Sequence, residues 1–166
     1  MHELFYDFCF GGENRGYYHL QQTDTVLYSE TKFHQPNGEL YVNTFTLQLE
    51  GDKVLAYQYR DEAWVDFRAQ PKHIYPTSAY PLLLPKALND PYVYTAFSEH
   101  DGSVLGETVL TKKGQDITEV RQGNTVRRFT MRGGTPIYID WGGPISYLCK
   151  TKEEAVKGTK LGLSDG

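Results

Sequence analysis

The chain consists largely of short segments in which apolar and polar residues alternate, with turn residues between them about every nine to twelve positions. Residues 40–49 divide by position into two sets: Tyr41, Phe45, Leu47 and Leu49 on one side, and Leu40, Val42, Thr44 and Thr46 on the other. Successive side chains of a strand point to opposite faces of a sheet, so this period of two predicts β-strands. We therefore expect an all-β fold, an antiparallel meander of about ten strands that curves into a half-open or closed barrel.

Residues 76–91 interrupt this pattern and hold four of the eight prolines, at positions 76, 81, 85 and 91. Proline lacks a backbone N–H and fixes φ, so the segment is not expected to be a central strand. Ser78 is placed to cap a short helix with Pro81 in its first turn. An apolar connection of this length predicts either a plug over an open sheet or a lid over a cavity.

Residues 151–158 carry the signals of a short C-terminal helix. Thr151 and Glu154 have the spacing of a capping box, and Gly158 stands where a helix often ends. We expect a two-turn helix there, followed by a flexible tail at 159–166. Residues 1–158 are expected to form a single domain, since the length suits one domain and no repeat is visible.

The net charge of the chain argues against some classes of binding partner. The chain has 17 Lys and Arg against 21 Asp and Glu, a formal net charge of −4. Nucleic acids and anionic membrane surfaces attract dense lysine and arginine, so we expect no nucleic-acid partner. The longest aliphatic patch, Leu82–Leu84, is too short for a membrane span. The first residues lack the pattern of a secretory signal, so a cytoplasmic location is expected.

Metal-binding and catalytic motifs are not apparent. The histidines, at positions 2, 19, 34, 73 and 100, include no pair at i,i+2 or i,i+4 spacing, so we expect no metal site and no cofactor. Gly11–Gly16 lacks the spacing of a phosphate loop and is better explained as a tight strand connection. The catalytic residues stay unassigned. Cys9 and Cys149 lie in the first and last strand-like segments, which a closed or nearly closed sheet could bring together. We expect two reduced, half-buried thiols, with a disulfide as the alternative.

Two neighbouring arginines stand inside a strand pattern at 125–132. Arg127 shares a face with Phe129 and Met131, and Arg128 lies on the other face, so at least one guanidinium points inward. A buried arginine needs a carboxylate or an anionic ligand, because an unpaired buried charge is costly. The candidate carboxylates in nearby strand patterns are Asp66, Glu119 and Asp140. Two interpretations stay open. One is structural, an ion pair or an arginine that snorkels from the rim of the sheet, and the other is recognition of a carboxylate or phosphate head group.

Tyrosine is abundant and falls mainly in or beside strand patterns. Its large apolar ring and single hydroxyl suit pocket walls, although β-propensity alone also enriches it in strands. The stretch Asp140–Pro144 is the most distinctive local sequence, since paired glycines follow Trp141. Such glycines mark either a sharp corner or a close approach to a ligand.

In strand count and turn spacing the chain resembles lipocalin-like barrels and bacterial half-barrels that hold lipid tails. This resemblance rests on no sequence motif, and it implies a concavity that holds one small ligand. We therefore expect binding of a small hydrophobic or amphipathic molecule, lipid-like and with an anionic head group in one version of the hypothesis. The expected head-group residues are Arg127 and Arg128 with Asp140 beside them, the expected walls are Trp64, Tyr57, Tyr94 and Trp141, and the expected lid is Tyr80–Leu88.

Two other functions stay open at this stage. One is an enzyme on the same barrel, of the acid–base lyase, isomerase or hydrolase type, using Arg127 or Arg128 with Asp140 or His19. The other is a β-sandwich whose exposed tyrosines contact carbohydrate or a partner protein. The exposure of the tyrosines distinguishes this platform from a binding barrel. A homodimer is also left open.

Overall fold

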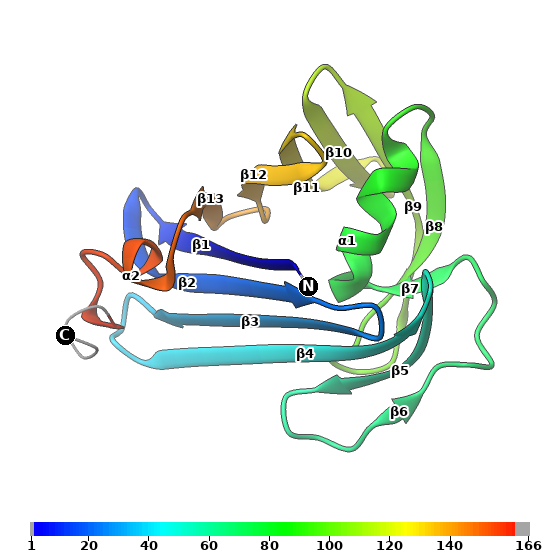
Figure 1. Ribbon diagram of the computed structural model, residues 1–166, viewed down its shortest axis with the longest axis horizontal. Helices are drawn as coiled ribbons and strands as arrows, with labels where there is room; N and C mark the ends of the chain where they lie inside the picture. Colours follow the sequence, from blue (N-terminus) through cyan, green and yellow to red (C-terminus); the bar gives the residue numbers. More distant parts are fainter. Residues whose placement is uncertain (1, 162–166) are drawn as a thin grey trace.

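The computed structural model describes residues 2–161, and in this range thirteen strands form one large sheet with short helices (Figure 1). The strands are β1 (His2–Phe10), β2 (Glu13–Gln22), β3 (Val26–His34), β4 (Leu40–Glu50), β5 (Lys53–Tyr59), β6 (Val65–Asp66), β7 (Ile74–Pro76), β8 (Tyr92–Phe97), β9 (Val104–Lys113), β10 (Asp116–Arg121), β11 (Asn124–Arg132), β12 (Thr135–Asp140) and β13 (Ile145–Cys149). The predicted all-β class is confirmed. The strand number exceeds the predicted one partly because β6 and β7 are only two and three residues long.

The first strand lies in the middle of the sheet, and the chain runs outward from it to one edge at β6. The chain then crosses to the other edge at β7 and returns strand by strand to the middle at β13. The strand order is β6-β5-β4-β3-β2-β1-β13-β12-β11-β10-β9-β8-β7. Neighbouring strands are antiparallel except β7 and β8, which are parallel and are joined by a long connection, residues 77–91, that returns the chain to the same end of the sheet. The central seam joins β1 to β13, with Phe5 opposite Cys149. The first and last strands are therefore neighbours, which the sequence left open, and both cysteines are free thiols, as expected.

The sheet curves strongly but does not close. Its edge strands, β6 and β7, have no hydrogen-bonded pairing with each other in the described chain. Aromatic side chains nevertheless connect the two ends: the ring of Phe97 in β8 lies 5.7 Å from Tyr57 in β5 and 5.1 Å from Phe67 just after β6. Of the two predicted forms the structure has the open one, and ring contacts join the two ends of the sheet where strand pairing does not.

A helical segment lies inside the curve of the sheet (Figure 1). It comprises η1 (Thr77–Ala79), α1 (Tyr80–Leu83) and η2 (Leu84–Ala87). The side chains of Tyr80, Leu83 and Leu84 are buried in the main core. The segment that we expected to be a lid, Tyr80–Leu88, therefore begins as a plug packed within the concavity, the alternative that the sequence left open.

A distant carboxylate, and not Ser78, holds the start of this helical segment. Glu99 accepts hydrogen bonds from the backbone N–H groups of Thr77 (3.1 Å) and Ser78 (3.0 Å) and from the Thr77 hydroxyl (2.8 Å). The expected Ser78 cap is wrong, because no side-chain cap hydrogen bond is present at η1 or α1. Backbone donors at a helix start need an acceptor, and Glu99 supplies it from the residues just after β8.

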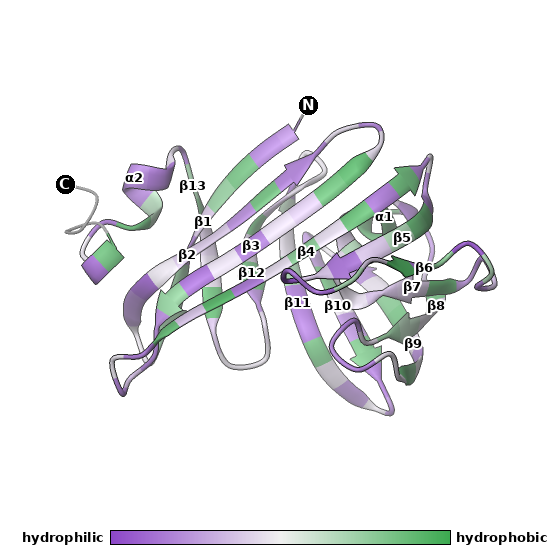
Figure 2. Ribbon diagram, turned by 90° about the horizontal axis from the view of Figure 1, so that it is seen from below, coloured by the Kyte–Doolittle hydropathy of each residue, from purple (hydrophilic) through white to green (hydrophobic). Residues whose placement is uncertain are grey.

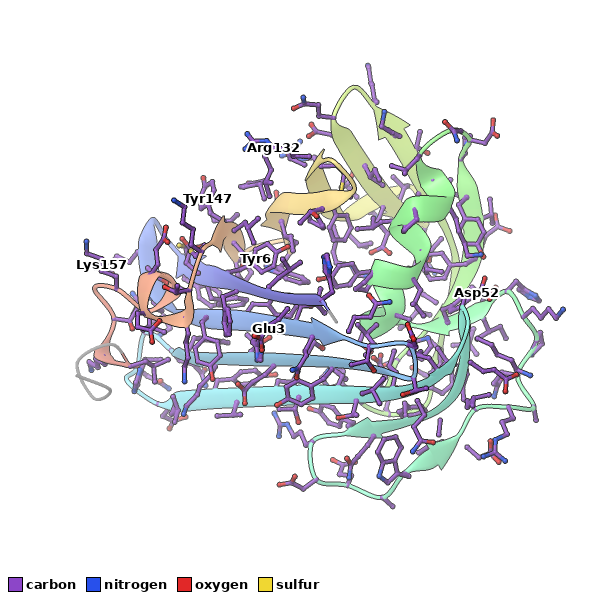
Figure 3. The ribbon with its side chains drawn as sticks, in the orientation of Figure 1. Glu3, Tyr6, Asp52, Arg132, Tyr147 and Lys157 are labelled. Atoms are coloured by element: carbon purple, nitrogen blue, oxygen red, sulfur yellow. The ribbon has the colours of Figure 1, made fainter. Side chains whose placement is uncertain are left out.

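The core lies between the inner face of the sheet and the helical segment. Its fully buried members include Tyr6, Leu47, Phe129 and Ile139, from strands on both sides of the seam. Figure 2 shows apolar and polar residues alternating along strands such as β4, as expected for a sheet with one buried face. Figure 3 shows Tyr6 on the inner side of the sheet and Tyr147 on the outside, where 48% of Tyr147 is exposed.

The helix α2 (Lys152–Ala155) packs on the outer face, where Ala155, Val156 and Leu161 form a small cluster with Tyr17. The Thr151 hydroxyl accepts a hydrogen bond from the Glu154 N–H (3.1 Å), as the capping box predicted. The helix is one turn long, shorter than expected. Thr159 and Leu161 are buried, although we placed the start of the flexible tail at 159; residues 162–166 lie outside the described residues. Among residues 2–161, no helix is long and apolar enough to cross a bilayer.

Candidate functional site

A pocket of about 340 Å³ opens on the concave side of the sheet, next to the helical segment. We call it the aromatic pocket, because eight of its sixteen lining residues are Phe, Tyr or Trp. The full lining is Phe8, Phe10, Tyr18, Ser29, Thr31, Phe33, Tyr41, Asn43, Phe45, Thr77, Ser78, Tyr80, His100, Arg127, Trp141 and Pro144. Its volume falls at the lower end of the range of about 300–1,000 Å³ typical of small-molecule sites.

One wall of the aromatic pocket depends on a glycine. Gly16 of β2 pairs with Phe8 of β1 on one side and with Phe33 of β3 on the other. The Phe8 and Phe33 rings stack with their centroids 4.7 Å apart. A Cβ at Gly16 would lie 2.0 Å from the Lys32 carbonyl oxygen and 2.6 Å from the Phe33 Cβ, so a side chain does not fit there. The missing side chain lets two rings from non-adjacent strands meet above β2.

Hydrogen bonds and a ring contact hold three further aromatic side chains of the pocket, Tyr18, Tyr80 and Trp141. The Tyr18 and Tyr80 hydroxyls lie 2.7 Å apart, and the Trp141 ring packs edge-on against Tyr18 with centroids 4.9 Å apart. The Trp141 indole N–H donates to the Ser146 hydroxyl at 3.0 Å. These bonds fix the orientation of three rings that line the pocket, since each ring has a partner at its polar end.

Two buried polar atoms at the pocket lack a partner. The Asn43 Oδ1 and Ser78 Oγ atoms have no hydrogen bond within residues 2–161, and both side chains line the aromatic pocket. Asn43 is 9% exposed and Ser78 is 8% exposed. A buried polar group without a hydrogen bond costs about 1–3 kcal/mol, so such groups are rare without a ligand or water to satisfy them. Each atom is therefore a candidate hydrogen-bond partner for a polar group of a bound molecule.

Arg127 also lines the aromatic pocket, and its guanidinium already has partners within the protein. It faces Glu119 across the β10–β11 pair, with Nε at 2.6 Å from Oε1 and Nη2 at 3.1 Å from Oε2. Its Nη2 also donates to the Thr77 carbonyl oxygen at 3.0 Å, and its guanidinium lies 4.9 Å from the centroid of the Tyr80 ring. The Tyr94 hydroxyl donates a further hydrogen bond to Glu119. Arg127 thus joins β10, β11 and the helical segment.

Burial and the charge of the partner shift the pKa values of Glu119 and Arg127 in opposite directions. Burial by itself would raise the pKa of Glu119, but the Arg127 charge and hydrogen bonds outweigh it and hold that pKa below its ordinary value of 4.5. Burial would lower the pKa of Arg127, whereas Glu119 raises it above its ordinary value. Burial raises the pKa of Tyr18 to about 12 and that of Tyr80 well above its ordinary value. Both hydroxyls are therefore protonated at neutral pH.

A second pocket, of about 420 Å³, lies on the other side of Tyr80. We call it the aliphatic pocket, because its apolar lining is mainly leucine and proline. Its lining is His2, Leu4, Leu20, Gln22, Thr23, Asp24, Tyr80, Pro81, Leu84, Pro85, Gly134, Thr135 and Pro136. None of the buried polar atoms that lack a partner within residues 2–161 belongs to it.

Of the sequence-predicted site residues, the structure places two on the aromatic pocket, Arg127 and Trp141. Tyr57 and Tyr94 are buried in the core, 4% and 1% exposed, and do not line the pocket; Tyr94 donates to Glu119, which in turn pairs with the lining residue Arg127. The expected pairing of an inward arginine with a carboxylate is present, and the partner is Glu119. This pair is the structural interpretation of Arg127 that the sequence left open.

The remaining predicted residues lie away from the aromatic pocket. Arg128 is exposed and lies 3.7 Å from Asp140, a pair that borders a separate surface hollow. Trp64 is 44% exposed just before β6. His19, the base considered for an enzyme, stacks on Phe5 and lies 2.9 Å from Glu3. The side chains named for proton transfer are therefore not gathered at the aromatic pocket.

Several pocket residues were missed by the sequence analysis. They include Phe8, Phe10, Tyr18, Ser29, Thr31, Phe33, Tyr41, Asn43, Phe45, Thr77, Ser78 and His100. The useful signal was Asn43, an amide on the same strand face as Tyr41 and Phe45, where alternation predicts an apolar residue. Eight of the thirteen tyrosines, all of them in the described chain, are buried and only Tyr147 is exposed, so the tyrosines do not form a flat outer platform.

Comparison of the sequence with models of known protein families, with curated proteins and with solved structures found no match. Within residues 2–161, no group of three or more His, Cys, Asp and Glu side chains is placed to hold a metal ion.

Proposed function

We propose that this protein binds a small amphipathic molecule in the aromatic pocket. The apolar body of the ligand contacts the aromatic walls formed by β1, β3 and β4, and its polar group lies beside Asn43, Ser78 and Arg127. This is the common design of a small-molecule site, in which mostly apolar walls surround a few placed polar groups.

The observation that carries the proposal is the pair of unsatisfied polar atoms, Asn43 Oδ1 and Ser78 Oγ. An apolar residue at either position would remove the cost of burying an unpaired polar group. A ligand that bonds to both atoms removes the same cost when it binds, which gives these side chains a role in recognition.

The test is native mass spectrometry of the protein purified from its own host, followed by denaturing mass spectrometry of the same sample. A bound molecule gives the native protein an added mass that is lost on denaturation. The blocking variant is Thr31→Trp, since Thr31 lines the pocket between Tyr18 of β2 and Asn43 of β4. The matched control is Thr111→Trp on β9, an exposed position outside the pocket.

We expect the added mass in the wild-type protein and in Thr111→Trp, and its loss in Thr31→Trp. Circular dichroism of both variants checks that they are folded. A wild-type protein without added mass, or equal occupancy in a folded Thr31→Trp variant, would contradict the proposal.

A further inference from the structure

The aromatic pocket has almost no aliphatic surface. Among its sixteen lining residues, which all belong to the described chain, none is Leu, Ile, Val or Met, and Pro144 is the one saturated apolar side chain. Aromatic rings present flat, rigid faces, and they prefer offset-stacked or edge-to-face contacts with other rings. A flexible acyl chain gains no such contact geometry, whereas a flat ring system does. The walls therefore select for shape as well as for apolarity.

The rings are already arranged as stacking surfaces. Phe33 lies at the centre of one wall, 4.7 Å from Phe8, 5.2 Å from Phe10 and 4.9 Å from Tyr41, measured between ring centroids. His100 contacts the ring of Phe45 at the rim of the same wall, with centroids 5.7 Å apart. Because neighbouring rings support one another, the wall keeps its form in the absence of a ligand.

The charged groups around Arg127 do not favour an anionic ligand. Arg127 is the pocket's one lining Lys or Arg, and Glu119 already engages it through two hydrogen bonds. Glu99, only 4% exposed, stands behind Thr77 and Ser78 and takes part in none of the ion pairs within residues 2–161. One guanidinium thus stands with two carboxylates. A further carboxylate or phosphate would be buried without a free counter-ion, at high cost.

From these observations we infer that the ligand of the aromatic pocket is a flat aromatic molecule that carries a hydrogen-bonding group and no acidic group. The inference rests on the proposed function and names its ligand class. It replaces the lipid-like ligand with an anionic head group that the sequence suggested. Arg127 then acts as a stacking surface and as a brace of the helical segment, and a ligand carboxylate has no role.

The test uses two fluorescent probes with the same ring skeleton but different charge. N-phenylnaphthylamine is uncharged and carries one N–H donor, and anilinonaphthalene sulfonate adds a sulfonate to that skeleton. Each is titrated into the full-length protein, and palmitate is then added as an acyl-chain competitor with an acidic head group. Thr31→Trp and Thr111→Trp are titrated in parallel, so that binding in the aromatic pocket is separated from binding elsewhere.

We expect N-phenylnaphthylamine to bind about tenfold more tightly than the sulfonate, to resist displacement by palmitate and to lose affinity in Thr31→Trp alone. Equal or tighter binding of the sulfonate in the same pocket, or displacement by palmitate, would overturn the ligand class and leave the proposed function standing. If no probe binds in a Thr31-dependent manner and the native protein carries no added mass, the ligand class and the proposed function both fail.

Discussion

The two pockets on either side of Tyr80 differ in chemistry more than in size. The aliphatic pocket is the larger, about 420 Å³ against about 340 Å³, and its polar lining residues lie mostly at exposed positions such as Thr23 and Asp24. The aromatic pocket has stacked rings, a buried ion pair and two unsatisfied polar atoms. Volume would favour the first pocket as a binding site, whereas the state of the buried polar groups favours the second. Polar groups held in place at a cost indicate recognition better than open space does.

The largest effect is expected from removing the charge that braces the aromatic pocket. Arg127→Met leaves the Glu119 carboxylate buried without its partner, so it should lower the free energy of unfolding by about 3–5 kcal/mol in urea denaturation. The controls are Arg128→Met on the exposed face and Asp24→Ala at the aliphatic pocket, each expected to change it by less than about 0.5 kcal/mol. If Arg127→Met is as stable as Arg128→Met, the buried ion pair does not stabilise the aromatic pocket, and this difference between the two pockets is wrong.

The next effect concerns the glycine beneath the stacked rings. Gly16→Ala introduces a Cβ where the Lys32 carbonyl oxygen and the Phe33 Cβ already lie, so β2 and β3 must move apart. We expect a loss of about 1–3 kcal/mol in the free energy of unfolding, together with weaker N-phenylnaphthylamine binding. Gly143→Ala is the control, since a Cβ there meets nothing within 4 Å and its φ is not in the left-handed region. Unchanged stability in Gly16→Ala would show that the sheet accommodates a side chain between the rings.

Two buried serines, Ser146 and Ser78, are expected to differ in how their replacement by alanine changes stability, by a smaller amount than the changes above. Ser146→Ala removes the acceptor of the Trp141 indole N–H and should cost about 1 kcal/mol in thermal or urea unfolding. Ser78→Ala removes a hydroxyl without a partner, so the ligand-free protein should be equally or more stable, while the amount of co-purified ligand falls. A destabilised, ligand-free Ser78→Ala variant would mean that the hydroxyl serves the fold and not a bound molecule.

The smallest expected effect is the contribution of Glu119 to the pH dependence of the free energy of unfolding. The pKa of Glu119 is lower in the folded protein than its ordinary value of 4.5, so between the two values the unfolded chain binds more protons and stability rises with pH. The contribution is complete above 4.5 and is lost as the pH falls through the folded-state pKa. Glu119→Gln should flatten this part of the stability curve, measured by urea unfolding at several pH values. Glu13→Gln, at an exposed carboxylate, serves as the control and should keep the slope.

Much of the fold could be predicted because it depends on local signals. Alternation and turns marked most of the long strands, and the prolines correctly excluded 76–91 from the centre of the sheet. Within this range only Pro76 belongs to a strand, the edge strand β7. The number of strands and the open edge could not be predicted. The two-residue strand β6 is too short to show a period of two, and closure depends on contacts between strands far apart in sequence.

The candidate site was harder, because it depends on which face of each strand points inward. Arg127 shares its face with Phe129, which is fully buried, so alternation was sufficient to place it inside. Arg128 and Asp140 then had to point outward, and we counted them in the site only because the face was left undecided. Ser78 gave no usable signal, since it lies in an irregular segment whose start is fixed by Glu99, 21 residues further along the chain.

The central seam between β1 and β13 has a consequence for how this chain folds. Most neighbouring strands follow each other in sequence, so each half of the sheet can form from hairpins, but the seam joins segments near opposite ends of the chain. The Tyr6 hydroxyl also donates across this seam to the carbonyl oxygen of Pro136 in β12, 130 residues further along the chain. Contacts of such long range carry a large loop-closure entropy and slow folding. Until the seam forms, β1 and β13 both present unpaired edges that other chains can join. Refolding yield should therefore fall as protein concentration rises.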